Sequence, residues 1–288
     1  MEDLAAAAEI RLGTFGGGGV PGAPGAPAPP TGIRYEVLGP LRVRGPRSSG
    51  FISAPKMEAV LALLLVRAGQ VVSMDALVAE IWGDRAPRRV IASLQVYVSN
   101  LRKLLAAPGR EESPIVTRAP GYLLNLSDDE LDLHDFQRFL QLGKEHARAK
   151  RHEQAVGSFR HALALCRGSA FSGIEDIQAI KSFATWCDEL RLECSELLFE
   201  SKLALGEHRD LIGDLHTLVT DYPLREAFHR QLMLALYRSD RQADALAAYR
   251  SLRDNLYHEL GLAPCRGLRD LQQAILVSDS RLEYLEAV

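Results

Sequence analysis

Residues 87–107 read PRRVIASLQVYVSNLRKLLAA and predict a helix with two unlike faces. One face collects apolar residues that recur at steps of three and four, as a helix with about 3.6 residues per turn requires: Ile91, Leu94, Val98, Leu101 and Leu105. The other face carries basic and short side chains and no carboxylate: Arg88, Arg89, Ala92, Ser93, Val96, Ser99, Asn100 and Lys103. Residues 85–110 hold six Lys or Arg and no Asp or Glu, which favours a polyanion as partner. A solvated helix face is the alternative, although such faces usually mix both signs of charge.

Short elements flank this helix in a definite order. In residues 33–45, apolar and polar side chains alternate on both sides of a Gly-Pro turn. This pattern predicts two or three short antiparallel strands. One helix is expected over residues 55–68 and a second over residues 73–83, with Ser73 as its N-cap. Residues 115–126, IVTRAPGYLLNL, have the pattern of a β-hairpin. A small sheet, three helices and a hairpin predict a winged helix-turn-helix, whose third helix enters the major groove of DNA.

This architecture places the candidate DNA contacts on the third helix and on the hairpin, or wing. Arg118 at the wing tip is expected to follow an adjacent minor groove, the alternative being an ordinary surface arginine. Val96 either meets a thymine methyl group or fills space, and Trp82 is expected in the core. Basic and polar residues are expected to reach phosphates or base edges. The predicted DNA-binding residues are Arg88, Arg89, Ser93, Val96, Ser99, Asn100, Lys103 and Arg118.

Charge separates the chain into two halves. Residues 31–126 hold 13 Lys or Arg and 7 Asp or Glu. Residues 127–288 hold 20 Lys or Arg and 27 Asp or Glu. Positive charge in excess therefore lies in the first half, where it suits a phosphate backbone. A chain of 288 residues favours two domains.

No apolar run approaches the roughly 20 residues that span a bilayer, and the first residues lack the basic start of a secretory signal. We therefore expect a cytoplasmic, nucleoid-associated protein without a membrane partner.

The second half has an almost entirely helical pattern. Five residues fall where a tetratricopeptide repeat places its large, small and aromatic packing residues: Phe139, Gly143, Ala155, Phe159 and Ala162. Ala245 and Tyr249 repeat part of this pattern. Such helix pairs stack into a solenoid, which either binds proteins on its concave face or braces the DNA-binding domain. The predicted fold class is mainly α with small β, a winged helix-turn-helix followed by an all-α tetratricopeptide-like helical repeat domain.

Composition sets the expected domain boundaries. Residues 1–32 are rich in Gly, Ala and Pro and predict a disordered leader. Residues 33–126 form the predicted DNA-binding domain, residues 127–277 the helical domain, and residues 278–288 a C-terminal tail. The sequence contains no GxSxG, HExxH, P-loop or paired metal-ligand cluster, and its four cysteines lack metal-site spacing. We therefore expect no enzyme activity, catalytic residue, cofactor or metal.

Together these motifs resemble one known family. The segments IRYEVLGPLRV, EIWGD, LQVYVSNLRKLL, TRAPGYLL, PLRE and LMLALYRSDRQADALAAYRSLRDNLYHELGLAP are similar to a small-type Streptomyces antibiotic regulatory protein, over about residues 33–277. That family joins an OmpR-like winged helix to a bacterial transcriptional activation domain. The resemblance implies an activator of secondary-metabolite genes that binds direct repeats in double-stranded promoter DNA near the -35 element.

The resemblance also implies partners other than DNA. Two or more protomers would lie side by side on the repeats, and they would recruit RNA polymerase holoenzyme, especially through sigma region 4. Asp84 and Arg85, between the second and third helices, become candidates for that contact, the alternative being a simple turn. A repressor of the same architecture and a tetratricopeptide-type interaction scaffold remain alternatives, because the same DNA contacts serve either sign of regulation.

Overall fold

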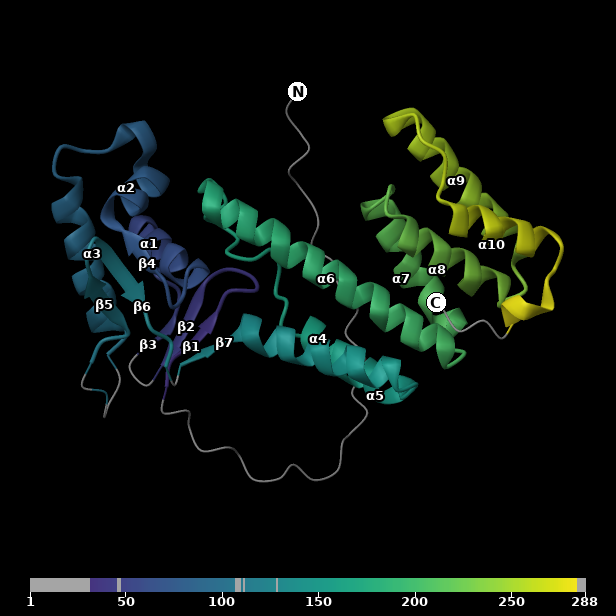
Figure 1. The fold of residues 1–288 in the computed structure, drawn as a ribbon, viewed down its shortest axis with the longest axis horizontal. Helices are drawn as coiled ribbons and strands as arrows, with labels where there is room; N and C mark the ends of the chain where they lie inside the picture. Colours follow the sequence, from purple (N-terminus) through teal and green to yellow (C-terminus); the bar gives the residue numbers. More distant parts are fainter. Residues whose placement is uncertain (1–31, 46–47, 107–109, 111, 128, 284–288) are drawn as a thin grey trace. The chain divides into compact units, whose positions relative to one another are not determined.

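The computed structural model describes residues 32–45, 48–106, 110, 112–127 and 129–283, and the chain forms two compact units (Figure 1). The first unit contains the residues up to His134 together with Cys166–Asp188. The second contains Asp135–Leu165 and the residues from Glu189 onward. Both units are built mainly from helices, with two small sheets in the first, which confirms the predicted fold class.

The first unit combines three helices with two sheets. One sheet has the strand order β3-β2-β1-β7, in which β1 and β7 run parallel and the other neighbours antiparallel. The second sheet is antiparallel with the order β4-β6-β5. The elements are β1 Arg34–Glu36, β2 Arg42–Gly45, β3 Ser48–Gly50, α1 Pro55–Val66, β4 Val71–Ser73, α2 Met74–Trp82, η1 Gly83–Arg85, α3 Val90–Leu104, β5 Ile115–Arg118, β6 Gly121–Leu124 and β7 Glu130–Leu131.

Local sequence explains where the first helices begin and end. Pro55 occupies the first turn of α1, where a missing N–H breaks no helical hydrogen bond. Every residue of Ala59–Leu65 is buried, so α1 is the centre of the unit rather than a surface helix. Gly69 follows α1 at a φ of 78°, in the left-handed region that glycine adopts readily. Ser73 is the N-cap of α2 as predicted, because its hydroxyl oxygen accepts the N–H of Ala76 at 3.1 Å.

The first unit extends beyond the predicted domain boundary at residue 126. Strand β7 pairs with β1, and the unit therefore continues to His134. Residues 166–188, which we expected in the helical domain, also belong to it. The backbone N–H groups of Arg167 and Phe171 donate to carbonyl oxygens between β1 and β2, at 2.7 and 3.1 Å. These pairings join segments far apart in the chain, for which a local sequence pattern carries no signal.

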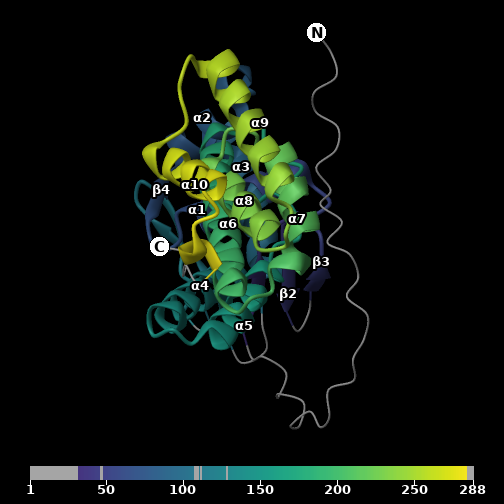
Figure 2. The same ribbon diagram turned by 90° about the vertical axis from the view of Figure 1, so that its right-hand side faces the viewer.

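Helix pairs make up the second unit, in which α7, α8 and α9 pack against one another in succession (Figure 2). Two of its helices, α4 and α6, begin in the first unit and continue into the second. The helices are α4 Asp132–Arg148, α5 His152–Leu163, α6 Gln178–Ala204, α7 His208–Asp221, α8 Glu226–Tyr237, α9 Gln242–Leu260 and α10 Arg266–Leu276.

The packing between helices follows the predicted repeat. A Cβ atom at Gly143 would lie 2.4 Å from the ring of Phe159, so the small residue is required for the close approach of α4 and α5. Phe139 is only half-buried. The remaining predicted packing residues are buried: Gly143, Ala155, Phe159 and Ala162 in the first repeat and Ala245 and Tyr249 in the last.

The chain remains folded beyond residue 277, the predicted end of the helical domain. The 3-10 helix η2, Ser280–Glu283, follows α10, and Leu282 is buried in the core of the second unit. The Leu282 carbonyl accepts a hydrogen bond from Nε of Arg238 at 2.9 Å. Residues 280–283, which we expected in the tail, therefore belong to the second unit. Residues 284–288 of that tail and residues 1–31 of the predicted leader lie outside the described residues.

Candidate nucleic-acid interface

Helix α3 packs on the core along the predicted apolar stripe. Leu94, Leu101 and Leu105 are fully buried, and Val98 is 1% exposed. The prediction for Ile91 is wrong, because this side chain is 38% exposed. The helix begins at Val90 rather than at Pro87, so Ile91 belongs to its first turn, where the stripe extends past the core. The stripe fixes which face of α3 is left for a partner.

The opposite face of α3 is open. Val96 is 55% exposed, and it is the apolar residue among the predicted DNA contacts. Ser93 is half-buried, and its hydroxyl donates to the carbonyl of Arg89 at 3.3 Å. The remaining predicted contacts on or next to α3 are exposed: Arg88, Arg89, Ser99, Asn100 and Lys103.

Two of the six basic residues between 85 and 110 serve the fold rather than this face. Arg110 donates from Nη1 to both carboxylate oxygens of Asp129, at 3.0 and 2.9 Å. Asp129 also accepts the N–H of Ile33 at 2.9 Å and the hydroxyl of Tyr35 at 3.3 Å. Burial, reinforced by the charge of Asp129, raises the pKa of Tyr35, so this hydroxyl stays a donor. Arg102 is the second such residue and contacts the wing.

The wing is the hairpin of β5 and β6, with Arg118 exposed at its tip as predicted. Gly121 follows the turn, and a Cβ atom there would lie 1.9 Å from the carbonyl oxygen of Val72 in β4. The Pro120 carbonyl accepts the N–H of Met74 at 3.2 Å. The close approach of β6 to β4 and the bond to the start of α2 fix the wing tip relative to the helix-turn-helix.

An aromatic stack joins the three helices of the motif. Trp82 is half-buried rather than fully in the core, and its ring stacks on Tyr97 of α3 with 6.3 Å between centroids and 14° between planes. Lys56 of α1 lies 5.6 Å above the Trp82 ring and donates to the Ile81 carbonyl at 2.6 Å. This stack joins the end of α2 to α3.

Asp84 and Arg85, the candidate polymerase contacts, lie in η1 and are exposed.

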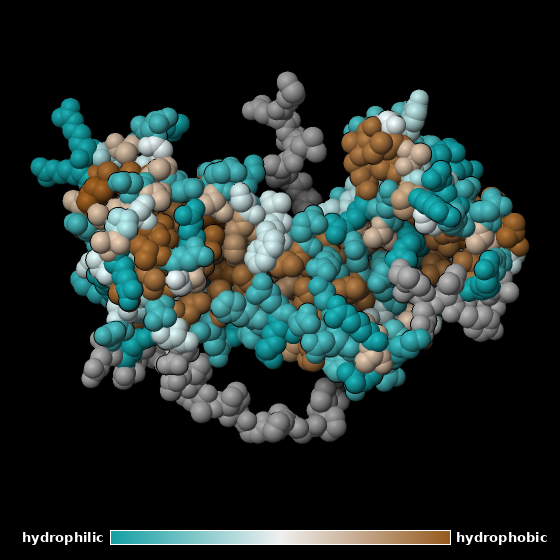
Figure 3. All heavy atoms as spheres, in the orientation of Figure 1, coloured by the Kyte–Doolittle hydropathy of each residue, from teal (hydrophilic) through white to brown (hydrophobic). Residues whose placement is uncertain are grey.

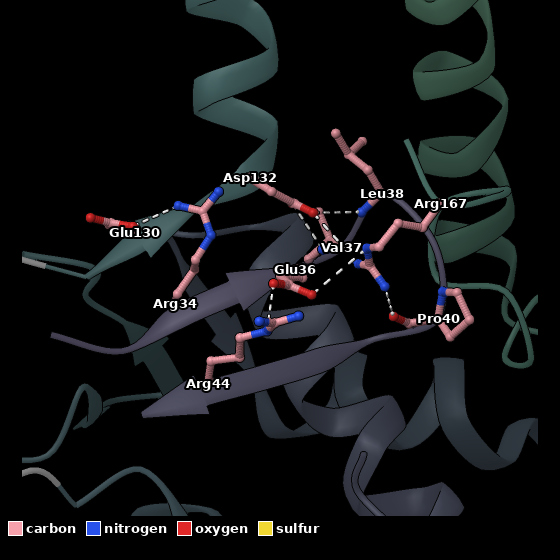
Figure 4. A network of polar contacts seen from close by, with 9 residues as sticks. All are labelled: Arg34, Glu36, Val37, Leu38, Pro40, Arg44, Glu130, Asp132 and Arg167. Carbon is pink, nitrogen blue, oxygen red and sulfur yellow. Dashed lines mark hydrogen bonds and ion pairs between the residues drawn. The ribbon is translucent and has the colours of Figure 1, made fainter. Parts of the chain in front are cut away.

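An ion cluster surrounds Arg167, and no local sequence pattern predicts it (Figure 4). Asp132 accepts the N–H groups of Val37 and Leu38 at 2.8 and 3.2 Å. The guanidinium of Arg167 lies 3.6 Å from Asp132 and 3.7 Å from Glu36. Burial raises the pKa of Asp132, while the two backbone donors and Arg167 oppose that rise. The cluster joins β1 to the start of α4 and to residues 166–188, the returning segment of the first unit.

The comparisons with known proteins agree with this architecture. The family described as bacterial transcriptional activator domain matches residues 131–276, and the family described as transcriptional regulatory protein, C terminal, matches residues 52–124. Regulatory protein DnrI of Streptomyces peucetius is 32% identical over 257 residues, which are 87% of this chain and 94% of DnrI. The chain belongs to the Streptomyces antibiotic regulatory protein family. This family membership confirms the resemblance predicted from the motifs.

Longer relatives share the same two parts. Transcriptional regulatory protein EmbR of Mycobacterium tuberculosis is 36% identical over 245 residues, 85% of this chain and 63% of EmbR. A solved structure of EmbR, in complex with a low affinity phosphopeptide, superposes with a TM-score of 0.80 at 35% identity and covers 85% of this chain and 65% of that one. The chain thus spans less than two thirds of EmbR. Among the described helices, none is long and apolar enough to cross a membrane.

Proposed function

We propose that this protein is a sequence-specific, DNA-binding activator of a secondary-metabolite gene cluster. The observation that carries the proposal is the open face of α3, where basic and hydrogen-bonding side chains surround Val96 on a winged helix. Membership in a family of transcriptional regulators supports it, since DnrI and Transcriptional regulator RedD of Streptomyces coelicolor belong to the same family. In this arrangement α3 reads the major groove and Arg118 follows the minor groove.

Base reading is assigned to the middle of the face. In this proposal Asn100 and Ser99 bond to base edges, Val96 meets a methyl group, and Arg89 contacts guanine. We expect Asn100→Ala to weaken binding to the specific site by about 1–3 kcal/mol more than binding to random duplex. Titrations of both duplexes test this assignment. An equal loss on both would make Asn100 a residue that positions the helix without reading sequence.

We further infer that two or more protomers lie head to tail on direct repeats. Half-sites about 10 to 11 base pairs apart place both protomers on one face of the duplex. An insertion of about five base pairs between the half-sites rotates one protomer by half a turn, and we expect it to abolish joint binding and activation. Equal affinity and activation from that spacer variant would rule the arrangement out.

Activation is assigned to contacts with RNA polymerase holoenzyme, especially sigma region 4. Asp84 and Arg85 lie exposed in η1, beside the helix that enters the groove. Exposed apolar side chains gather at the end of α9 (Figure 3), and a patch of this kind suits a protein partner: Tyr257, Leu260 and Leu262.

In vitro transcription with purified holoenzyme separates activator from repressor. We expect the full chain to stimulate transcription, and Arg85→Ala to bind DNA normally but to stimulate less. A full chain that lowers transcript yield at the same promoter would make the protein a repressor. Normal stimulation by Arg85→Ala would remove η1 from the polymerase contact.

A further inference from the structure

Arg102 is a basic residue of α3 whose side chain contacts the wing. Its Nε donates to the carbonyl of Ile115 at 3.0 Å, and its Nη2 donates to the hydroxyl of Thr117 at 2.7 Å. Its guanidinium also lies 5.9 Å from the ring centroid of Tyr122. Ile115 and Thr117 belong to β5, and Tyr122 belongs to β6. One side chain of the recognition helix therefore contacts both strands of the wing.

The position of β5 gives these contacts their importance. In the strand order β4-β6-β5, strand β5 is at the edge of the sheet, paired with β6 on one side. Strand β6 is anchored on β4 and, through the turn, on the start of α2. The wing is thus fixed to α2 through β6, and Arg102 fixes it to α3 through β5. Hydrogen bonds from a guanidinium are stronger than those between neutral groups.

The Arg102 contacts lie close to the wing tip. Thr117 directly precedes Arg118, the residue assigned to the minor groove. A duplex that meets α3 in its major groove reaches Arg118 only if the wing stands at the matching distance from α3. Arg102 is half-buried and donates two hydrogen bonds within the protein, whereas Lys103 beside it is exposed.

We propose that Arg102 is a positioning residue that sets the distance between α3 and the wing, so that the major-groove and minor-groove contacts are made together. The proposal rests on the proposed function, because it concerns binding of one duplex by both elements. Arg102 acts through Arg118 and not by its own contact with a phosphate. Loss of the Arg102 guanidinium should therefore remove what Arg118 contributes to DNA binding.

A double-mutant cycle in the full chain tests this role. The variants are Arg102→Met, which keeps an apolar stem, Arg118→Ala, and the two combined. The probe is the duplex that the wild-type chain selects from a randomised library. We expect each single variant to weaken binding about tenfold, and the double variant also about tenfold rather than a hundredfold. The slope of log K against log salt should fall by the same amount in all three variants.

A second variant separates positioning from a folding defect. Thr117→Val removes one acceptor of Arg102 and leaves every charge in place. We expect it to weaken DNA binding less than Arg102→Met does. In the Arg118→Ala background, Thr117→Val should cause no further loss of affinity. Faster hydrogen exchange at the wing amides of Arg102→Met, with exchange in α1 unchanged, is the expected structural signature.

Several outcomes would overturn the proposal. A hundredfold loss of affinity in the double variant, with a salt slope that falls by the sum of the two single changes, would make Arg102 an independent phosphate contact. Unchanged affinity in Arg102→Met would leave it no role in binding. In both cases the wild-type chain still binds its duplex and the proposed function stands. If the wild-type chain selects no duplex at all, the proposed function fails and this proposal fails with it.

Discussion

Lys103 is an exposed cation in the last turn of α3, on the face opposite the core. Each neutralised phosphate contributes about 0.9 to the slope of log K against log salt, so Lys103→Ala should flatten that slope by about one. Arg209→Ala is the matched control, because it removes an exposed positive charge from α7 in the second unit. Anisotropy titrations at several salt concentrations give the slopes. An unchanged slope for Lys103→Ala would exclude it from the interface.

Arg167 is a residue whose effect on stability should depend on pH. Arg167→Met leaves Asp132 buried without its cation, and breaking such a pair costs about 3 kcal/mol of unfolding free energy at neutral pH. Asp132 has a raised pKa in the folded state, so the penalty for its charge is present above that pKa. The penalty disappears as pH falls toward the unfolded value of about 3.9, because the protonated carboxyl needs no cation.

Urea unfolding midpoints at neutral pH and at about pH 4.5 test this dependence. We expect the gap between wild type and Arg167→Met to narrow at the lower pH. Arg34→Met is the control, because its partner Glu130 is half exposed and such pairs contribute less than about 1 kcal/mol. A gap of equal size at both pH values would show that the Asp132 charge is not its cause.

At the scale of elements, the close approach of α4 and α5 makes opposite predictions for two glycines. Gly143→Ala places a methyl group against the ring of Phe159 and should destabilise the protein by about 1–3 kcal/mol. Gly157 of α5 has open space around a built Cβ atom, so Gly157→Ala should stabilise it by about 0.5–1 kcal/mol through helix propensity. Thermal unfolding of both variants shows whether each substitution lowers or raises the melting temperature. Shifts of similar size and direction in the melting temperature would contradict the repeat packing.

Periodicity in the sequence is sufficient to predict the first three helices and the wing hairpin, because their apolar residues recur over several turns or alternate along a strand. Strand β7 has two residues, too few for a period, and it pairs with a strand about a hundred positions earlier. The helical wheel predicts the open face of α3 from angles alone. It does not predict where a long side chain such as Arg102 reaches, because that depends on the hairpin packed beside it.

At the scale of the whole molecule, the first unit is discontinuous in sequence. A fragment ending at Leu126 lacks β7, Asp132 and the returning segment with Phe171, which is fully buried. We expect this fragment to unfold at a lower temperature than a fragment ending at Asp188, which retains all of them. Calorimetry of the two fragments measures the difference. Equal midpoints would mean that the returning segment adds nothing to the stability of the DNA-binding unit.

The return of residues 166–188 to the first unit also sets the order of events during synthesis. The hydrogen bond from Arg167 to the Pro40 carbonyl spans 127 positions of the chain. Ribosomes add about 5–20 residues per second. Many seconds therefore pass between the synthesis of β1 and the exit of residues 166–188 from the ribosome. Until then the nascent chain carries an unfinished sheet beside a nearly complete helix-turn-helix. The first unit therefore completes its fold only when much of the helical half has been made.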